Sequence, residues 1–170
     1  MDGVDPTLSP DLIAKIGVLH TINEKVTEYI RAIPELEPVH HIFDEDSATV
    51  EQDIQDAMQG TEKLSIMLGT GDGTDVAEGA VGQVIFNPLE IQILCIEQPN
   101  LNRGEGGTGI TVNRLAELVA INMKGQPIGE HFVSKVDFRI PKNLGGSVAA
   151  RLVVLTCAAS LQLNNSTLSD

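Results

Sequence analysis

Three glycines, Gly104, Gly106 and Gly109, stand at the G-x-G-x-x-G spacing of a dinucleotide-binding loop in the segment NRGEGGTGITVNRLAEL (102–118). Such a loop would hold a cofactor's pyrophosphate on backbone N–H groups at the start of a helix. The chemistry also requires a strand that ends at the first glycine and an acid at the end of a second parallel strand. Here six polar or turn residues, 98–103, precede the first glycine, and no P-loop lysine follows. We therefore expect a flexible connection to a helix, and no nucleotide or other cofactor.

Two histidines, His40 and His41, precede an acidic run of Asp44, Glu45 and Asp46, and these residue types can bind metal ions. Adjacent residues of a strand point to opposite faces, so the side chains cannot easily share one ion. We expect them to be polar surface residues that form no metal site.

The remaining residues that could do chemistry lack partners at a useful spacing. Segment 69–79 has acids and glycines but lacks the ligand spacing and bidentate glutamate of a calcium loop, so we expect a solvated, mobile loop. The serines lack a nucleophile elbow, and His20 and His131 have no recognisable serine or cysteine partner. Cys95 and Cys157 lie in apolar runs, as buried reduced thiols do, and are too few for a zinc site. We expect no catalytic residues and a protein that is not an enzyme.

Length and composition predict one soluble domain. The chain has 170 residues, of which 42% are hydrophobic, which is enough for one core. We expect a single domain over 1–170, with a compact core at about 9–161 and polar tails at 1–8 and 162–170. No run of 18 or more apolar residues occurs, and the acidic, proline-bearing start is unlike a signal peptide. We therefore expect a protein made in a cytosol, with no membrane partner.

The formal net charge of −13 is concentrated in the first half of the chain. Residues 1–80 hold 17 acids and 4 bases, whereas residues 81–170 hold 7 of each. Nucleic-acid binding depends on lysines and arginines that neutralise phosphates, so this charge disfavours sequence-specific binding to DNA or RNA. A solvated acidic surface that aids solubility explains a good part of the charge.

The spacing of apolar residues predicts alternating helices and strands. Steps of three and four predict helices over these ranges: 9–33, 49–60 and 111–124. Alternating or continuous apolar runs predict strands over these ranges: 39–43, 62–68, 82–98, 131–140 and 147–161. Ser9 and Pro10 mark the start of the first helix, Thr49 and Gln52 fit a capping box for the second, and Asn87–Pro88 indicates a bend or an edge.

The segment HFVSKVDFRI (131–140) has the period of two of a half-buried antiparallel strand. One side of that strand carries Phe132, Ser134, Val136, Phe138 and Ile140. The other side carries His131, Lys135, Asp137 and Arg139 together with Val133. We expect the first, mainly apolar side to face the core.

The element order predicts an α+β fold: an antiparallel (mixed) β-sheet covered by two to three α-helices, with a long glycine-rich β-hairpin arm. The arm is segment 67–83, flanked by the strand-forming runs LSIML and QVIF. Its glycines give the backbone little preference and its acids resist burial, so we expect it to be mobile until it meets a neighbouring molecule. The candidate docking residues of the arm are Gly69, Gly71, Asp72, Gly73, Asp75 and Glu78.

Taken together, the layout resembles that of the tail terminators of tailed bacteriophages, a family of minor tail or tail completion proteins. The resemblance covers roughly residues 9–161 and lies in the arrangement of elements. The segments that carry it are "AIPEL", "HHIFDEDSATVEQDIQDAM", "LSIMLGTGDG…GQVIFNPLEIQILCIEQP", "TVNRLAELVAINMKG" and "FVSKVDFRIPKN…ARLVVLTCAASLQ".

The resemblance implies a non-enzymatic virion protein that assembles in the host cytoplasm and forms a ring, usually a hexamer, at the head-proximal end of the tail. Its partners would be other copies of itself, the tail tube protein, the neck or connector protein, and the sheath where a tail has one. DNA would pass through the ring without specific binding, and Asp44, Glu45 and Asp46 are candidate acids for lining that passage. Two alternatives remain: another phage neck or baseplate adaptor, or a small cytosolic nucleotide-binding enzyme that uses the 104–109 loop.

Overall fold

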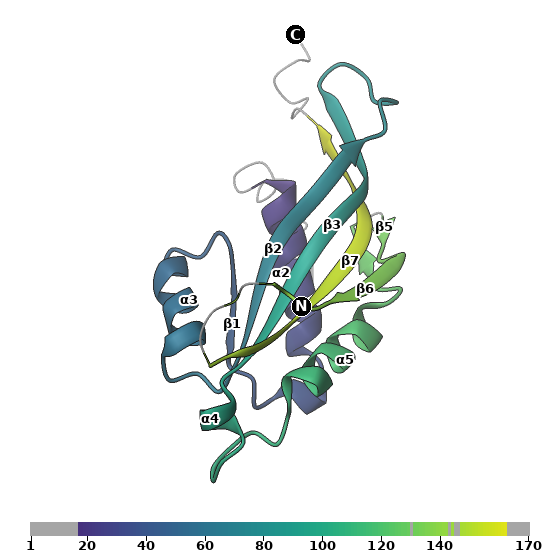
Figure 1. Cartoon of the computed structure of the whole chain (residues 1–170). Helices are drawn as coiled ribbons and strands as arrows, with labels where there is room; N and C mark the ends of the chain where they lie inside the picture. Colours follow the sequence, from purple (N-terminus) through teal and green to yellow (C-terminus); the bar gives the residue numbers. More distant parts are fainter. Residues whose placement is uncertain (1–16, 130, 143, 145–146, 163–170) are drawn as a thin grey trace, which may run out of the picture.

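A computed structural model describes residues 17–129, 131–142, 144 and 147–162. Figure 1 shows an α+β fold in which one mixed sheet of five strands, in the order β1-β2-β3-β7-β6, is combined with helices. The predicted fold class is therefore confirmed. The predicted start of the first helix at Ser9 and Pro10, and the expected polar tails apart from Gln162, lie outside the described residues.

The strands of the main sheet are β1 (His41–Asp44), β2 (Leu64–Asp75), β3 (Gln83–Glu97), β6 (Lys135–Arg139) and β7 (Ala149–Gln162). β1 runs parallel to β2, and the other neighbours are antiparallel. Two short strands, β4 (Pro127–Ile128) and β5 (His131–Phe132), form a separate pair.

The helices in the described part of the chain are α2 (Val18–Arg31), α3 (Val50–Gln59), α4 (Pro99–Asn102) and α5 (Val112–Met123), with a short 3-10 helix at Pro34–Leu36. Thr111 caps α5 as predicted, because its side-chain oxygen accepts the backbone N–H of Arg114. The predicted capping box at α3 is wrong. The Thr49 hydroxyl instead donates to Asp53, and Gln52 donates to Asp56.

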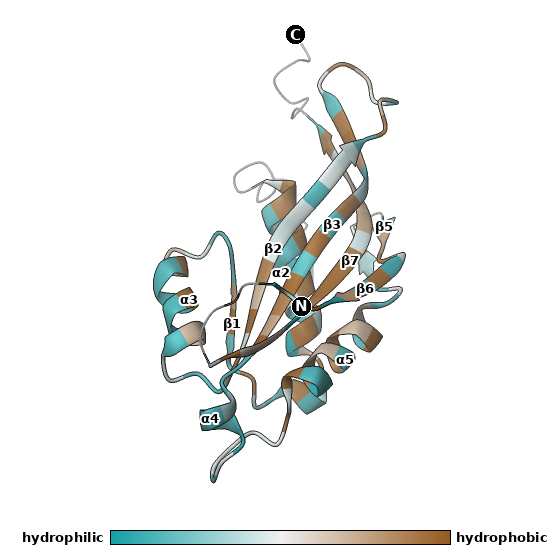
Figure 2. Ribbon diagram, viewed as in Figure 1, coloured by the Kyte–Doolittle hydropathy of each residue, from teal (hydrophilic) through white to brown (hydrophobic). Residues whose placement is uncertain are grey.

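The core lies between the sheet and the helices α2 and α5, which cover one face (Figure 1). The largest side chains of this core with no appreciable exposure include Ile30, Ile66, Leu68, Ile91, Ile93, Leu115, Met123 and Leu155. Each contributes about 1.5–3 kcal/mol by leaving water. Helix α3 covers part of the opposite face through a smaller cluster of Phe43, Ala57, Ile96 and Ala150. Cys95 and Cys157 are buried free thiols, as expected. Figure 2 shows hydrophobic residues along β3 and β7 and mostly hydrophilic ones on α4.

The sequence 64–97 forms one long antiparallel hairpin, and its outer end extends beyond the helix-covered part of the sheet (Figure 1). The candidate arm residues Gly69, Gly71, Asp72, Gly73 and Asp75 belong to β2, so the loop expected over 69–79 is in fact strand as far as Asp75. Only residues 76–82 connect the two strands, and Glu78 lies there. The mobility of the arm and its ordering on contact stay predictions.

Gly73 has a packing reason to be glycine. A Cβ at this position would lie 3.1 Å from the Phe86 ring and 3.2 Å from Leu89. The β2–β3 register also shifts on both sides of Gly73, as at a bulge. Close approach of the hairpin strands, rather than freedom of the backbone, therefore accounts for this glycine.

Two expectations about strands need correction. Of the two alternatives at Asn87–Pro88, the edge is wrong, because β3 lies between β2 and β7. The other alternative, a bend, agrees with the shift in the β3–β7 register between Phe86 and Leu89. Segment 131–140 forms two strands rather than one, β5 and β6.

The side of segment 131–140 predicted to be buried is largely exposed. Phe132, Phe138 and Ile140 are 62%, 55% and 65% exposed, whereas Val133, placed on the polar side, is 1% exposed. Phe138 is exposed because β6 is an edge strand, although Phe138 lies opposite the buried Val153. The burial of Val133 has a local cause between β5 and β6, where the Val133 N–H donates to Gln126 and the Val133 carbonyl accepts the N–H of Gly125. These bonds turn Val133 into the core and break the alternation.

Candidate functional site

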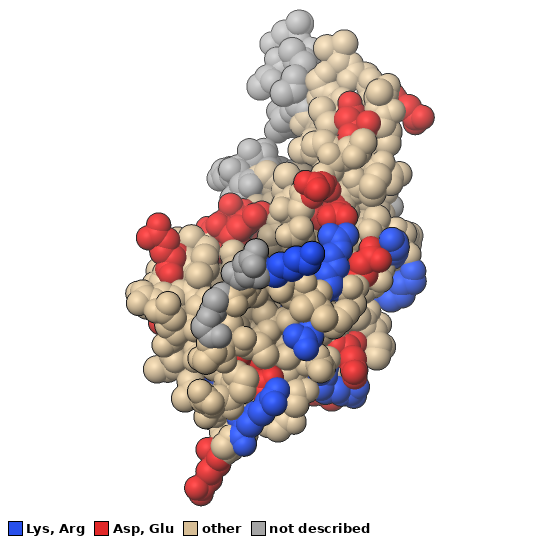
Figure 3. Space-filling view, viewed as in Figure 1, with Lys and Arg blue, Asp and Glu red and all other residues tan. Residues whose placement is uncertain are grey.

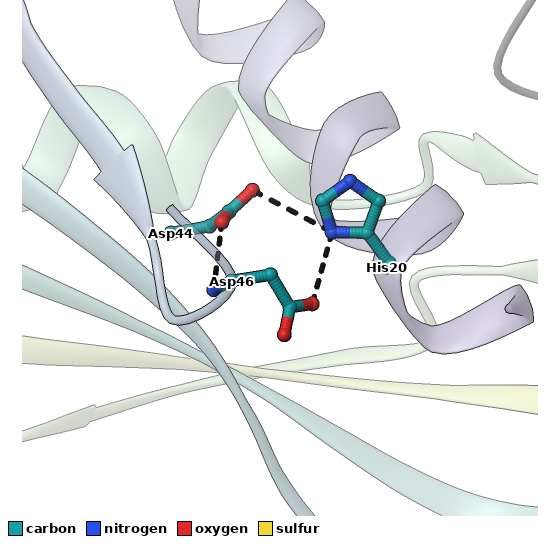
Figure 4. A group of neighbouring side chains, drawn as sticks. All are labelled: His20, Asp44 and Asp46. Atoms are coloured by element: carbon teal, nitrogen blue, oxygen red, sulfur yellow. Dashed lines mark hydrogen bonds and ion pairs between the residues drawn. The ribbon is translucent and has the colours of Figure 1, made fainter. Parts of the chain in front are cut away.

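The acidic turn after β1 meets a histidine from a different part of the chain. His20, on α2, has its Nδ1 atom 2.9 Å from Asp46 Oδ2 and 3.9 Å from Asp44 Oδ2 (Figure 4). The Nε2 atom of His20 lies 3.1 Å from Glu24 Oε1. The histidine that joins these acids is therefore His20, for which the sequence offered no partner, and not the neighbouring His40 or His41.

His41 belongs to a separate network that attaches α3 to the sheet. Its Nδ1 atom lies 2.8 Å from Ser65 Oγ, and its Nε2 atom lies 3.2 Å from Asp53 Oδ1. Burial alone would raise the pKa of Asp53, but the hydrogen bonds from His41, Thr49 and Ser47 outweigh it and lower that pKa. His40 is exposed.

Glu45, one of the candidate lumen acids, has a structural role. Its backbone N–H donates to the Leu68 carbonyl, and its carboxylate accepts the N–H of Thr70 at 2.9 Å. Thr70 lies beyond the residues of β2 that pair with β1, so Glu45 supplies an acceptor where the parallel pairing ends. This contact joins the acidic turn to the middle of β2.

His20, Asp44 and Asp46 could each offer one ligand atom to a metal ion, and these atoms lie within 4.8 Å of one another. Imidazole and carboxylate together suit a divalent cation. Yet His20 already bonds both Asp46 and Glu24, and Asp44 accepts the backbone N–H of Asp46 at 2.9 Å. We interpret the group as an electrostatic link between α2 and the turn after β1, which needs no metal to be complete.

The link should make stability depend on pH. Burial alone would lower the pKa of His20, but the hydrogen bond with Asp46 and the charges of Asp44 and Glu24 raise it above the ordinary value. A raised pKa in the folded state adds stability below pH of about 6.5, and that stability is lost as the pH rises through the folded pKa. From about pH 6 to about pH 9, the free energy of unfolding should fall by up to about 1 kcal/mol more in the wild-type chain than in the His20→Gln variant. Urea unfolding at both pH values measures this difference, and equal losses in the two proteins would contradict it.

The glycine loop is organised by a buried acid, Glu97, at the end of β3. The Glu97 side chain is 0% exposed and accepts hydrogen bonds from Arg103 Nε at 3.0 Å, Asn102 Nδ2 at 2.9 Å and the backbone N–H of Val112 at 2.9 Å. Burial alone would raise the pKa of Glu97, but the bonds from Arg103, Asn102 and Val112 lower it.

Val112 is the first residue of α5, so the Glu97 carboxylate occupies the place where a helix N-terminus would bind a phosphate. Asn102 adds to this arrangement, because it donates to the Ile110 carbonyl and accepts from the Thr108 backbone N–H and hydroxyl. A shallow hollow lies beside the loop glycines. The chain's own carboxylate therefore takes the anion position, which supports the expectation that the loop binds no nucleotide.

The acidic residues of the candidate arm lie away from the candidate lumen acids. Asp72, Asp75 and Glu78 are exposed on the outer half of the hairpin. The two sets meet at Gly69, where a Cβ would lie 3.2 Å from the Glu45 carboxylate. Figure 3 shows acidic side chains along the hairpin and on the left of the molecule, and basic side chains mixed with acidic ones on the right and at the lower end.

None of the helices in the described residues is both long and apolar enough to cross a membrane. Comparison with models of protein families gives no match. A search of curated proteins finds no significant relative either.

Proposed function

We propose that the chain is a structural protein of a tailed-bacteriophage virion, a tail terminator that closes the head-proximal end of the tail tube. Copies of the chain form a ring, expected to be a hexamer, which stacks on the last ring of tube protein and presents its other side to the neck or connector. The protein acts by assembly and not by catalysis, and its place is the virion after assembly in the host cytoplasm.

The order and pairing of the elements are the observation that carries this proposal. The resemblance rests on a helix, a strand, a helix, a hairpin, a helix and a closing pair of strands, and these elements fold here as α2, β1, α3, β2–β3, α5 and β6–β7 around one sheet. The projecting end of the hairpin also offers a surface outside the body of the domain (Figure 1). Such a projecting surface would suit a protein that contacts a tube and a connector at once.

Charge supports the same proposal. The acidic first half of the chain forms β1, α3 and the outer half of the hairpin, where Asp46, Glu51 and Asp72 are exposed. A negative wall repels phosphates, so DNA can slide past it without being held. All three candidate acids have bonding partners, but the side chain of Asp46 is 54% exposed against 16% for Asp44, which makes Asp46 the better candidate of these two for lining a passage.

The proposal is tested by mixing the purified chain with purified tube protein and measuring the complexes by native mass spectrometry and electron microscopy. We expect a closed ring at one end of each tube. Added salt should promote ring formation, because it screens repulsion between acidic subunits. A chain that stays monomeric at all salt concentrations and leaves tubes uncapped would contradict the proposal. Binding to a baseplate or sheath protein in place of the tube would favour the adaptor alternative.

A further inference from the structure

The two edge strands of the sheet differ in chemistry. The strand order places β1 at one edge and β6 at the opposite edge (Figure 1). Within the described residues, β1 pairs only with β2, and β6 pairs only with β7. Each edge strand therefore has one side on which another molecule could lie.

The β6 edge, defined here as residues 135–140, combines exposed apolar and basic side chains. Phe138 and Ile140 are each more than half exposed. Large apolar side chains that gather on an edge strand favour contact with another protein surface. Because two such residues fall within this one short segment, we treat the β6 edge as a contact surface.

The same edge carries two exposed bases, Lys135 and Arg139, against a single acid, Asp137. Lys135 lies 3.1 Å from Asp137, and Arg139 lies 3.4 Å from Glu90 on β3. These exposed pairs are weak, and a binding partner can exchange them for its own carboxylates.

The opposite edge has the complementary charge. The β1–α3 edge, defined here as residues 46–56, contains four acids and no base. Asp46 and Glu51 are exposed, and Ile54 is 40% exposed. A surface hollow at the start of α3 is lined in part by Ala48, Val50 and Glu51, which offers apolar contact next to a carboxylate.

We propose that the β6 edge of one copy docks against the β1–α3 edge of the next copy. Complementary charges bring the two edges together, and the exposed side chains Phe138 and Ile140 leave water at the contact. Because the two surfaces lie on opposite edges of one sheet, the contact is head-to-tail, and repetition of it makes a ring when the rotation closes. That this contact is the subunit interface of a terminator ring rests on the proposed function.

The test uses charge reversal at two matched arginines. Arg139 is 48% exposed and pairs with Glu90, whereas Arg114, on α5, is 54% exposed and pairs with Glu117. Self-association of the full chain is measured by sedimentation at concentrations up to about millimolar, because a specific contact should have a dissociation constant below that concentration. We expect Arg139→Glu to weaken association by about tenfold or more, Phe138→Ser to weaken it similarly, and Arg114→Glu to change it by about twofold or less. Circular dichroism and urea unfolding check that each variant is folded, and Arg139→Gln gives a milder change at the same position.

A second substitution identifies the opposing surface. Glu51→Arg alone should weaken association, and the double variant Arg139→Glu/Glu51→Arg should recover part of it, because the reversed charges attract again. A wild-type chain that remains monomeric, an Arg139→Glu chain that associates like Arg114→Glu, or a double variant without recovery would each overturn the inference. Self-association through these edges without tube binding would instead overturn only the proposed function. If the Arg139→Glu chain caps tubes as well as wild type, only the inference about the two edges is overturned.

Discussion

Replacing Glu97 by alanine is expected to lower the free energy of unfolding by about 3 kcal/mol. The substitution removes the acceptor for Arg103, for Asn102 and for the first N–H of α5, and Asn102 and Val112 are 4% and 1% exposed. A buried donor without an acceptor costs free energy because water cannot replace the lost partner. Urea unfolding of the wild-type chain and the variant measures the change.

The matched control for Glu97→Ala is Glu105→Ala, because Glu105 is exposed in the same loop. That variant should change stability by less than about 0.5 kcal/mol. The pH dependence gives a second check. Since the folded pKa of Glu97 is lowered, its stabilisation is present above the unfolded pKa and is lost as the pH falls through the folded pKa. Glu97→Ala should therefore lose less stability on acidification than wild type, and equal stability of Glu97→Ala and Glu105→Ala would show that Glu97 does not organise the loop.

Shortening the hairpin is expected to abolish tube capping while the fold survives. Replacing residues 77–82 by Asn–Gly keeps the last pairs of the hairpin, because Asp75 pairs with Phe86 and the Val76 N–H donates to the Ile85 carbonyl. The removed residues include Glu78 and Val81, which are exposed, so stability should change by less than about 1 kcal/mol. Electron microscopy of tubes mixed with the shortened chain counts the capped ends.

A chain in which residues 77–82 are replaced by serine and glycine at unchanged length is the control for the shortened hairpin. If the side chains of the tip make the contact, this chain should cap as poorly as the shortened one. If only the length of the hairpin matters, the serine–glycine chain should cap tubes as well as wild type. A shortened chain that caps tubes as well as wild type would contradict a docking role for the hairpin tip.

Most of the helices and strands could be predicted from periodicity, because their burial follows it. In α5, Leu115, Leu118 and Val119 recur at helical steps and are buried, and Thr111 caps the helix as its residue type indicates. The same periodicity did not predict which side chains of segment 131–140 are buried. Its alternation is that of a strand with an apolar face, but the edge position of β6 leaves Phe138 uncovered, and position in a sheet is not encoded in alternation.

The contacts of the candidate site were harder to predict than its residue types. The acids after β1 stood out in the sequence, but their partner His20 lies more than twenty positions earlier, and only the packing of α2 brings it to them. Glu97 had a signal that sequence reasoning passed over, namely an acid that directly follows the apolar run IQILCI. A buried charge requires partners, and the nearby polar residues Asn102 and Arg103 supply them.

Because both cysteines are buried, their reactivity toward thiol reagents measures how often the native fold opens. Burial raises the pKa of the Cys95 thiol to about 12 and that of the Cys157 thiol to about 11, so the reactive thiolate is scarce at neutral pH. The two residues lie on β3 and β7, which pair with each other through the middle of the sheet. Modification by a thiol reagent therefore requires these central strands to separate or the domain to unfold, and its rate measures that opening. A cysteine introduced at Val81 could be labelled selectively without removing either native thiol, because Val81 is fully exposed.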